Sequence, residues 1–336
     1  MRVLVTGSAG FIGFHLCRRL LAEGHAVTGL DALTPYYDVR LKQARHAILE
    51  QSPKFQPLVG RLEDDAVVTA AFAEAPEIVV HLAAQAGVRH SLTHPEEYTE
   101  TNVVGTLAIL EAARRRVPKH LLIASSSSVY GMGEGPSKET DNTDRPASLY
   151  AATKKAAEAM SHSYAHLFGV PVTCLRFFTV YGPWGRPDMA PIRFAEAIMN
   201  GTPLDIYGQG RMRRDFTYVD DVVDAVMRLV PVVPVLDKPV GPDDTLSPIG
   251  PWRVVNIAGG RPVELMRFVS AMETAMGRVA EKNMLGMQQG DVVDTAADTS
   301  LLEALVGAIP ETPIEVGLAE FAAWFKGWKA ATPAAQ

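Results

Sequence analysis

The chain has 336 residues, of which 47% are hydrophobic and 21% are charged, and a formal net charge of −6 at pH 7. This length exceeds the roughly 250 to 300 residues that one core usually serves, which predicts a large domain, a smaller lobe and a cleft. The acidic balance excludes a surface that binds a phosphate backbone, and no apolar run approaches the roughly 18 residues that cross a bilayer. We therefore expect a cytoplasmic protein without a signal peptide, and neither a nucleic-acid nor a membrane partner.

Short apolar runs alternate with helical patterns up to about residue 179. In chain order the strand-like runs are RVLVTG, HAVTGLD, FQPLV, EIVVHLA, HLLIASS and PVTCLRFF, and the helical patterns cover residues 11–23, 66–75, 95–116 and 150–168. Runs that are apolar on both faces are typical of parallel strands covered by helices. The alternation predicts an α/β fold, with a Rossmann-like doubly wound parallel sheet over residues 1–179.

The pattern changes after Thr179. Shorter helical stretches, at 192–200, 220–230, 263–276 and 314–329, alternate with short strands such as LDIYG and RVVNIA. They predict a smaller mixed α/β lobe over residues 180–330, which we expect to bind the substrate. Residues 231–252 are rich in proline, which joins neither ladders nor helix interiors, so we expect a mobile surface insertion there rather than a binding lid. Residues 331–336 are expected to form a frayed tail.

Three glycines, Gly7, Gly10 and Gly13, lie between the first strand and the first helix. The first permits a sharp turn, the second lets the main chain approach a pyrophosphate, and the third allows the helix to pack closely on the strand. The helix N-terminus then points at the negative charge of the ligand. This motif predicts a dinucleotide site, which also includes the neighbouring residues Phe11 and Ile12.

Asp31 ends the second strand, 18 residues after Gly13. A carboxylate at this position accepts hydrogen bonds from both hydroxyls of an adenosine ribose and repels a 2′-phosphate, which favours NAD over NADP. The alternative is an aspartate that only serves the turn after a strand.

Tyr150 and Lys154 are four residues apart, and therefore lie on one face of a helix that Tyr150 opens. They follow the fifth strand and its serines, at the carboxyl end of the sheet where ligands bind. An unperturbed tyrosine has a pKa of about 10, and lowering it to about 7 takes about 4 kcal/mol of preferential phenolate stabilisation. Lys154 and a positive nicotinamide ring supply this together, which makes Tyr150 a candidate general base toward a sugar hydroxyl.

Six motifs together resemble a known family: VTGSAGFIG, HLAAQAGVRHS, ASSSSVYG, YAATKK, RFFTVYGPWGRPDM and RRDFTYVDD. They are similar to those of the extended short-chain dehydrogenase/reductases that act on nucleotide sugars, and most similar to UDP-glucuronate 4-epimerases. The likeness runs from Arg2 to Trp324, except in the proline-rich insertion. It implies tightly held NAD and a catalytic triad of Ser126, Tyr150 and Lys154.

The resemblance also implies further cofactor contacts, at Leu62, Ala83, Ala84, Asn102 and Ser125. Asn102 matches a residue that orders the region near the cofactor, although by itself it would be only a polar helix residue. One departure is Arg61, which stands where the family usually has an aspartate beside the adenine. This departure weakens one adenine contact and leaves the chemistry unchanged.

Ser127 and Ser128 occupy two slots that separate the reaction types of the family. The similar 4,6-dehydratases carry an Asp-Glu pair there, and UDP-glucuronate decarboxylases carry a glutamate in the second slot. Without a carboxyl group the site lacks the proton donor and acceptor for eliminating water. The expected reaction is therefore 4-epimerisation of UDP-glucuronate to UDP-galacturonate through a 4-keto intermediate. The alternatives are a UDP-glucose 4-epimerase and a non-catalytic NAD-binding regulator.

A 4-keto uronate is a β-keto acid, and it loses CO₂ when its C5–C6 bond lies perpendicular to the carbonyl plane. An epimerase must therefore hold the carboxylate in another orientation. The candidates are Ser127, Ser128, Thr179 and Arg186, because hydroxyls and a guanidinium suit a carboxylate. The resemblance supports Thr179 and Arg186, while the alternative for Arg186 is a loop ion pair with Asp188.

Three more residues are expected at the substrate. Arg89 follows the fourth strand and reaches either the sugar or a phosphate, unless it pairs with Glu96 or Glu97. By resemblance, Arg214 binds the diphosphate and Asp291 binds the uridine ribose.

The histidines and the two cysteines lack motif partners. We interpret them as structural or interfacial residues and expect no metal site. The family commonly dimerises through two long helices, and the small residues of AATKKAAEAM permit close helix approach, so we expect a homodimer.

Overall fold

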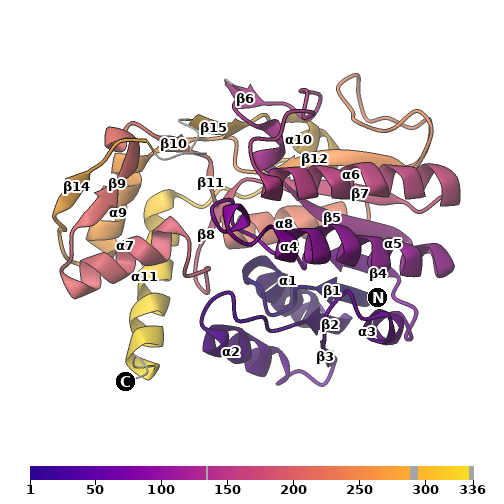
Figure 1. Ribbon diagram of the computed structural model, residues 1–336, viewed down its shortest axis with the longest axis horizontal. Coiled ribbons are helices and arrows are strands. Elements are labelled where there is room, and N and C mark those ends of the chain that lie inside the picture. The colour runs from indigo at the N-terminus through magenta and orange to yellow at the C-terminus, as the bar shows by residue number, and fades with distance from the viewer. Residues whose placement is uncertain (134, 288–293, 333–336) are drawn as a thin grey trace.

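Seven parallel strands form the main sheet, in the order β12-β7-β5-β4-β1-β2-β3 (Figure 1). The computed structural model describes residues 1–133, 135–287 and 294–332. The strands of this sheet are β1 (Arg2–Thr6), β2 (Ala26–Asp31), β3 (Phe55–Val59), β4 (Ile78–His81), β5 (His120–Ser126), β7 (Val172–Phe177) and β12 (Trp252–Ile257). The predicted α/β fold with a doubly wound parallel sheet is confirmed.

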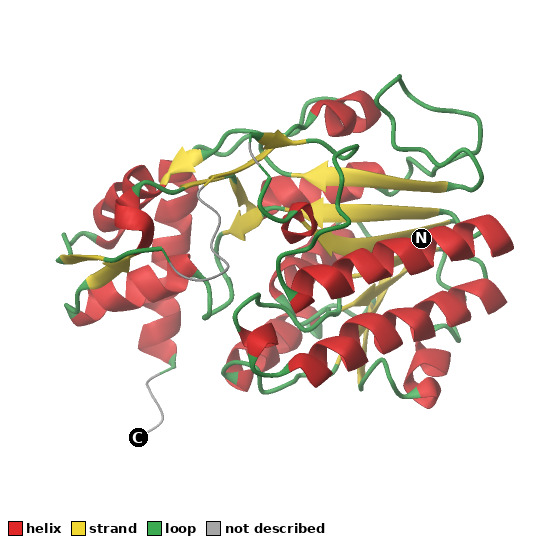
Figure 2. Cartoon of the chain, turned by 45° about the horizontal axis from the view of Figure 1, so that its top comes forward, coloured by secondary structure: helices red, strands yellow, loops and turns green. Residues whose placement is uncertain are grey.

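Helices cover both faces of the sheet (Figure 2). One face carries α1 (Phe11–Ala22), α2 (Val39–Leu49), α8 (Val219–Leu229) and α10 (Ser300–Val306), and the other carries α3 (Asp65–Ala71), α5 (Gly105–Arg115) and α6 (Leu149–Phe168). Alternate residues of a strand point to opposite faces. Accordingly, Val3 and Val5 of β1 enter the first of these two cores and Leu4 enters the second.

The order in which strands are added reverses between β1 and β4. From β1 the sheet grows through β2 to β3, and from β4 it grows through β5 and β7 to β12. In open α/β sheets the crevice outside the carboxyl ends of the strands at such a point binds ligands. The short segments η1 (His90–Leu92), α4 (Pro95–Tyr98), η2 (Thr99–Val104) and η3 (Ser127–Tyr130) follow β4 and β5 at this end.

A smaller lobe lies beside the carboxyl ends of the main sheet (Figure 1). Its core is formed largely by α7 (Ala190–Asn200), α9 (Leu265–Met276) and α11 (Ile314–Ala331). Its strands form three small sheets, which pair β8 (Thr179–Tyr181) with β11 (Phe216–Tyr218), pair β9 (Leu204–Ile206) with β14 (Lys282–Met284), and join β13 (Val263–Glu264), β10 (Arg213–Arg214), β15 (Asp294–Ala297) and β6 (Pro136–Ser137). The turn η4 (Tyr207–Gly210) follows β9.

The chain crosses between the two lobes more often than the sequence predicts. The strand β12 pairs with β7 along its whole length, from Trp252 opposite Val172 to Ile257 opposite Phe177. The helices α8 and α10 also pack in the core of the large domain. The expected division at residue 179 therefore does not coincide with the end of the main sheet.

Several elements differ from the prediction. The helices α2 and α10 were not predicted, and residues 263–264 form a strand in front of α9. The expected helix over 95–116 consists of α4, the π-helical turn η2 and α5 in succession. Helix α11 extends to Ala331, within the tail that was expected to fray.

The proline-rich insertion contains no helix or strand at residues 231–251, as expected. However, its second half is fixed to the large domain. The Asp244 carboxylate pairs with Arg253 of β12 at 2.7 Å, and both side chains are buried. Ser247 bonds to His162, and the Ile249 carbonyl bonds to His166, both on α6. These contacts anchor residues 244–249 to β12 and α6, and the mobility of the insertion stays a prediction.

No helix in the described ranges is long and apolar enough to cross a membrane.

Candidate active site

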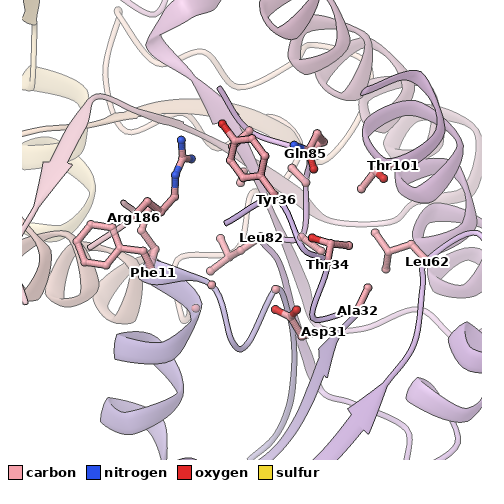
Figure 3. Close-up of a pocket in the computed structure, with 18 of the residues that line it drawn as sticks. Phe11, Asp31, Ala32, Thr34, Tyr36, Leu62, Leu82, Gln85, Thr101 and Arg186 are labelled. Carbon is pink, nitrogen blue, oxygen red and sulfur yellow. The ribbon is translucent and has the colours of Figure 1, made fainter. Parts of the chain in front are cut away.

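One cavity extends along the carboxyl ends of β1, β2, β4 and β5 (Figure 3). At the first-helix end it is lined by Gly7, Gly10, Phe11, Ile12, Gly13 and Asp31, farther along by Leu62, Ala83 and Ala84, and at the far end by Ser125, Ser126, Tyr150, Lys154 and Arg186. The structure thus brings the predicted cofactor motif and the predicted triad into one space.

Two glycines give the turn after β1 its shape. Gly7 has a φ of +73°, and a Cβ there would lie 2.8 Å from the backbone nitrogen of Ala83. A Cβ on Gly13 would lie 2.1 Å from the Gly7 carbonyl oxygen. Any side chain at either position would therefore push α1 or β4 away from the turn.

Asp31 fixes this turn from the neighbouring strand. Its carboxylate accepts hydrogen bonds from the Ala9 amide at 3.0 Å and from the Leu33 amide at 2.8 Å. An ionised carboxylate has about four lone-pair sites, so acceptor capacity remains for ribose hydroxyls.

The other requirements of a dinucleotide are also met here. Gly10 caps α1 without a side-chain hydrogen bond, which leaves amides of the first turn available to a pyrophosphate. Arg61 lines the same cavity and lies 3.2 Å from Glu63, so the residue that departs from the family pattern is engaged in an ion pair. The residues present fit NAD.

Tyr150 is at the first turn of α6, which Ser148 caps by accepting from the Ala151 amide. Burial raises the pKa of Tyr150, whereas its hydrogen bond with Ser126 and the charge of Arg186 act in the opposite direction. Arg186 thus faces the predicted base, which sequence reasoning had not anticipated. Unless the positive nicotinamide ring of NAD favours the phenolate, Tyr150 is protonated at neutral pH.

Lys154 lies one turn farther along α6 and is almost completely buried. Its ammonium group donates to the Ala124 carbonyl of β5 at 3.0 Å. Burial lowers the pKa of Lys154 to about 8. A charged lysine at this position raises the positive potential around the cavity and favours the phenolate form of Tyr150.

Asn102 joins the loop after β4 to the helix of Tyr150. Its side-chain oxygen accepts from the Gln85 amide at 2.8 Å, and its amide group donates to the Gln85 carbonyl and to Thr153, both at 3.0 Å. It is 1% exposed and lies in the π-helical turn η2. Asn102 therefore links Gln85, which lines the cavity, to the helix of Tyr150, but Asn102 does not itself line the cavity.

Arg186 lines the cavity and also forms an ion pair. Its guanidinium binds both oxygens of Asp188, at 3.1 and 2.6 Å, and the Tyr36 hydroxyl donates to Asp188 at 3.1 Å. The two interpretations that the sequence left open are therefore compatible. Asp188 and Tyr36 hold the guanidinium at the cavity wall, where a ligand carboxylate can meet it.

A family model described as "NAD dependent epimerase/dehydratase family" matches residues 3–234. The chain belongs to this family. Over 330 residues it is 56% identical to a probable UDP-glucuronate 4-epimerase from Rhizobium meliloti (strain 1021), a match that covers 97% of each chain.

Solved structures agree with this assignment. The chain is similar to UDP-glucuronic acid 4-epimerase from Bacillus cereus in complex with UDP-glucuronic acid and NAD, with a TM-score of 0.88 and 32% identity over 98% of this chain and 100% of that one. A tyrosine-to-phenylalanine mutant of that enzyme, in complex with UDP-4-deoxy-4-fluoro-glucuronic acid and NAD, has a TM-score of 0.86 and 31% identity over 98% and 100% of the two chains. The cofactor of this epimerase/dehydratase is NAD.

The serines of the epimerase/dehydratase that follow Ser126 form a 3₁₀ turn, η3. The Ser126 hydroxyl accepts from the Ser128 amide and donates to the Ser128 hydroxyl, both at 3.1 Å. Ser127 begins η3, and Thr179 begins β8. Among the described residues expected at the substrate, only Arg186 belongs to the cavity lining.

The remaining substrate candidates lie toward the smaller lobe. The Arg89 guanidinium lies over the Tyr207 ring, 5.5 Å from its centroid, while the neighbouring His90 is 3.2 Å from Glu97. Arg214 is in β10 and donates to the Arg213 carbonyl at 2.9 Å. Asp291 lies outside the described residues.

Sequence reasoning missed several residues of the cavity wall, chiefly on and before α2 and on the loop after β4. They include Thr34, Tyr36, Tyr37, Lys42, Gln85 and Thr101. Figure 3 shows Tyr36 and Gln85 lying between the Phe11 side and the Thr101 side of the cavity. The available signal was the pair Tyr36–Tyr37 in the loop between β2 and α2, because such loops carry binding residues.

One histidine cluster, in contact with Tyr36 of the cavity wall, has the residue types of a metal site. Potential ligand atoms of His90, His94 and Glu97 lie within 4.8 Å of one another. The two imidazoles are stacked, with centroids 4.0 Å apart and planes inclined by 12°. Nitrogen lone pairs lie in the ring plane, so two nearly parallel rings do not converge on one ion without turning. The observed arrangement is therefore not a preformed metal site.

Proposed function

We propose that this chain is an isomerase, a NAD-dependent UDP-glucuronate 4-epimerase that forms UDP-galacturonate through a 4-keto intermediate. The observation that carries the proposal is the position of Arg186 in the same cavity as Tyr150 and Ser126. A proton acceptor for a sugar hydroxyl and a guanidinium for a carboxylate therefore face one ligand space. The similar proteins from Rhizobium meliloti and Bacillus cereus support this substrate.

Tyr150 and Ser126 handle the proton of the sugar. Bound NAD supplies the reversible oxidation at C4. In its phenolate form Tyr150 takes the proton of the 4-hydroxyl, and Ser126 hydrogen-bonds to the same oxygen. After the keto sugar has turned its other face to the cofactor, Tyr150 returns the proton to that oxygen. Arg186 stabilises the phenolate through its positive charge, and a charged Lys154 in the same cavity adds to the positive potential there.

Arg186 also holds the carboxylate of the intermediate, together with Ser127, Ser128 and Thr179. A bidentate guanidinium contact fixes the plane of a carboxylate as well as its position. This keeps the C5–C6 bond out of the orientation in which CO₂ leaves. Because Asp188 and Tyr36 fix Arg186, the carboxylate meets a positioned group rather than a mobile one.

The test is incubation of the purified protein with UDP-glucuronate, without added cofactor, followed by separation of the uronate epimers and a CO₂ assay. We expect UDP-galacturonate and no UDP-pentose. Turnover of UDP-glucose alone would favour a UDP-glucose 4-epimerase. Formation of UDP-xylose would refute the role of Arg186 and its neighbours at the carboxylate.

A matched variant separates chemistry from binding. Tyr150→Phe is expected to lower kcat by about 10²- to 10⁴-fold, the usual contribution of a general acid–base group. The purified variant should still contain NAD, as measured by release of the nucleotide on denaturation. Loss of NAD together with activity would instead show that Tyr150 mainly serves cofactor binding.

The same proposal includes a homodimer in the cytoplasm. A partner copy packed on α5 and α6 would cover exposed apolar side chains: Val104 at the end of η2 is 47% exposed, Leu107 of α5 is 41% exposed and Leu167 of α6 is 65% exposed. Both cysteines, Cys17 and Cys174, are buried free thiols, which is typical of a reducing compartment.

A further inference from the structure

Arg45 is a fully buried arginine on α2, at 0% exposure. Its guanidinium donates to four oxygens. One nitrogen, Nη1, bonds to the Ala9 carbonyl and to the Tyr37 hydroxyl, each at 2.8 Å, and the other, Nη2, bonds to the carbonyls of Trp184 at 2.5 Å and Gly185 at 3.2 Å. A buried cation satisfied by neutral oxygens is costly, so its presence needs a reason other than core packing.

These contacts join two loops that are distant in sequence. Ala9 lies in the glycine-rich turn, between Gly7 and Gly10, where Asp31 holds its amide. Trp184 and Gly185 directly precede Arg186. A single rigid side chain therefore connects the pyrophosphate turn to the residue that faces Tyr150.

The backbone at Trp184 needs such support. Its φ is 60°, in a region that bulky residues rarely adopt. Its ring packs against Phe14 of α1 and against Trp324 and Trp328 of α11, with centroid distances of 5.4, 5.4 and 5.6 Å. The ring fixes one side of the residue and Arg45 fixes its carbonyl, so the direction in which the chain enters Arg186 is determined from both lobes.

We propose that Arg45 is a positioning residue for the sugar carboxylate: it fixes the Trp184–Gly185 backbone to the glycine-rich turn, and thereby sets where Arg186 stands relative to the cofactor. The proposal rests on the function proposed above. Only the planar, forked guanidinium reaches both loops at once, and a lysine at this position reaches one of them.

Displacement of Arg186 has a defined chemical consequence. In the 4-keto uronate the C5–C6 bond breaks, its electron pair passes into the enolate of the C4 carbonyl, and CO₂ leaves. A proton from water then adds to C5, which gives a UDP-4-ketopentose. Because this product has lost the carboxylate, its formation reports directly on how well that group was held.

The decisive experiment is a binding measurement in the Tyr150→Phe background, which removes turnover. We expect Arg45→Lys to weaken UDP-glucuronate binding by about tenfold, the loss of one charge-assisted contact, while UDP-glucose binding changes little. Arg40→Lys is the matched control, because Arg40 lies on the same helix in an exposed ion pair with Asp38. Equal weakening for both sugars would overturn the proposal, since a merely structural role does not discriminate at C6.

A double-mutant cycle tests whether Arg45 acts through Arg186. If it does, Arg45→Lys combined with Arg186→Lys binds UDP-glucuronate no more weakly than Arg186→Lys alone. Additive losses would contradict the coupling. In the active enzyme, Arg45→Lys should raise the ratio of CO₂ to UDP-galacturonate above that of the wild type, and an unchanged ratio also counts against the proposal.

Hydrogen exchange of the wild-type protein provides a test that needs no variant, should Arg45→Lys fail to fold. Adding NAD to the cofactor-free protein should slow amide exchange at Trp184 and Gly185, which are absent from the cavity lining, because Arg45 joins their carbonyls to the glycine-rich turn that meets the pyrophosphate. Unchanged exchange there would overturn the proposal. A wild type that forms no UDP-galacturonate would refute the proposed function instead, whatever the exchange shows.

Discussion

At the residue scale, the site depends on how burial and charge divide between two neighbours on α6. Burial favours the neutral forms of both Tyr150 and Lys154, and it lowers the pKa of Lys154 to about 8. Positive groups around the tyrosine offset this effect, and the cofactor ring adds to them when bound. We therefore expect the phenolate of Tyr150 to form more readily in the NAD-loaded enzyme than in the free protein.

This balance predicts a change in the pH profile. Lys154→Met removes a positive charge next to the cavity, so the pKa of Tyr150 rises and less phenolate exists at a given pH. The acidic limb of the kcat profile should therefore move to higher pH, with a loss of activity that is greatest near neutrality. The measurement is kcat between pH 6 and 10 for the NAD-loaded variant and the wild type. Lys155→Met, one residue along the same helix, is the control and should leave the limb in place.

Residue-level reasoning from sequence predicted that Ser126, Tyr150 and Lys154 share one site, and the structure places them in one cavity, but their neighbours were not predicted. Tyr36 and Asp188, which together hold Arg186, are 152 residues apart in the sequence. A local sequence pattern does not predict such a contact. Arg186 itself was correctly seen to have two possible partners. The structure shows that Arg186 forms the ion pair with Asp188 and lines the cavity at the same time. The sequence analysis treated these two roles as alternatives.

At the element scale, the strands were predictable because parallel strands buried on both faces form continuous apolar runs. Helix α2 was missed because its buried residues, Leu41, Lys42, Arg45, His46 and Leu49, include three polar side chains. A helix that buries cations for use at a site does not show an apolar stripe. Because helix α2 was not predicted, the residues on and before it that line one wall of the cavity were not predicted either.

Helix η2 gives a prediction at this scale. Asn102→Ala removes the hydrogen bonds that hold the loop after β4 to α6 and leaves the Gln85 backbone without those partners. We expect a loss of about 2 to 3 kcal/mol in the free energy of unfolding and weaker retention of NAD. Denaturant unfolding and nucleotide content after purification measure the two effects. Thr101→Ala, at the preceding and partly exposed position, should cost much less, and equal costs would contradict this role for Asn102.

The proposed dimer face provides a second prediction. Leu107→Glu places a charge on the exposed α5–α6 face and should shift the protein from dimer to monomer in size-exclusion chromatography with light scattering. Val279→Glu, at a position 77% exposed on the smaller lobe, is the control and should leave the dimer intact. A wild type that elutes as a monomer at all accessible concentrations would refute the dimer.

At the scale of the whole molecule, two buried histidines couple stability to pH. Burial lowers the pKa of His81 to about 3 and that of His120 to about 4, whereas the unfolded chain has about 6.5. Below pH 6.5 the unfolded state therefore binds protons that the folded state does not, and stability falls as the pH falls. Each histidine contributes a slope of about 1.4 kcal/mol per pH unit in this window.

The expected outcome is a free energy of unfolding that decreases steadily from pH 6.5 to 5. Guanidinium unfolding curves at several pH values measure it. In His81→Gln the slope of the unfolding free energy against pH should be smaller by the contribution of one histidine. His94→Gln, at an exposed position, should leave this slope unchanged. A slope that is the same in all three proteins would show that other groups control the acid limit.

The return of the chain to the main sheet was beyond prediction from local pattern. The run RVVNIA was recognised as a strand, but each of its residues pairs with a residue of β7 that lies 80 positions earlier, and only tertiary packing selects that partner. The same holds for α8, whose apolar stripe was visible while its place against α1 was not. Local sequence determines whether a segment forms a helix or a strand, whereas contacts with distant residues determine which lobe it joins.

The position of β12 at the edge of the sheet has a consequence for dissecting or recombining this enzyme. A fragment that stops at residue 179 would leave the outer hydrogen-bonding edge of β7 bare, along a strand buried in the complete chain. Bare edges of this kind recruit other strands, so such a fragment should precipitate rather than bind nucleotide. The part of the chain after residue 179 therefore cannot be exchanged at a single junction. A viable chimera needs at least one more crossover, so that a strand still pairs with the outer edge of β7.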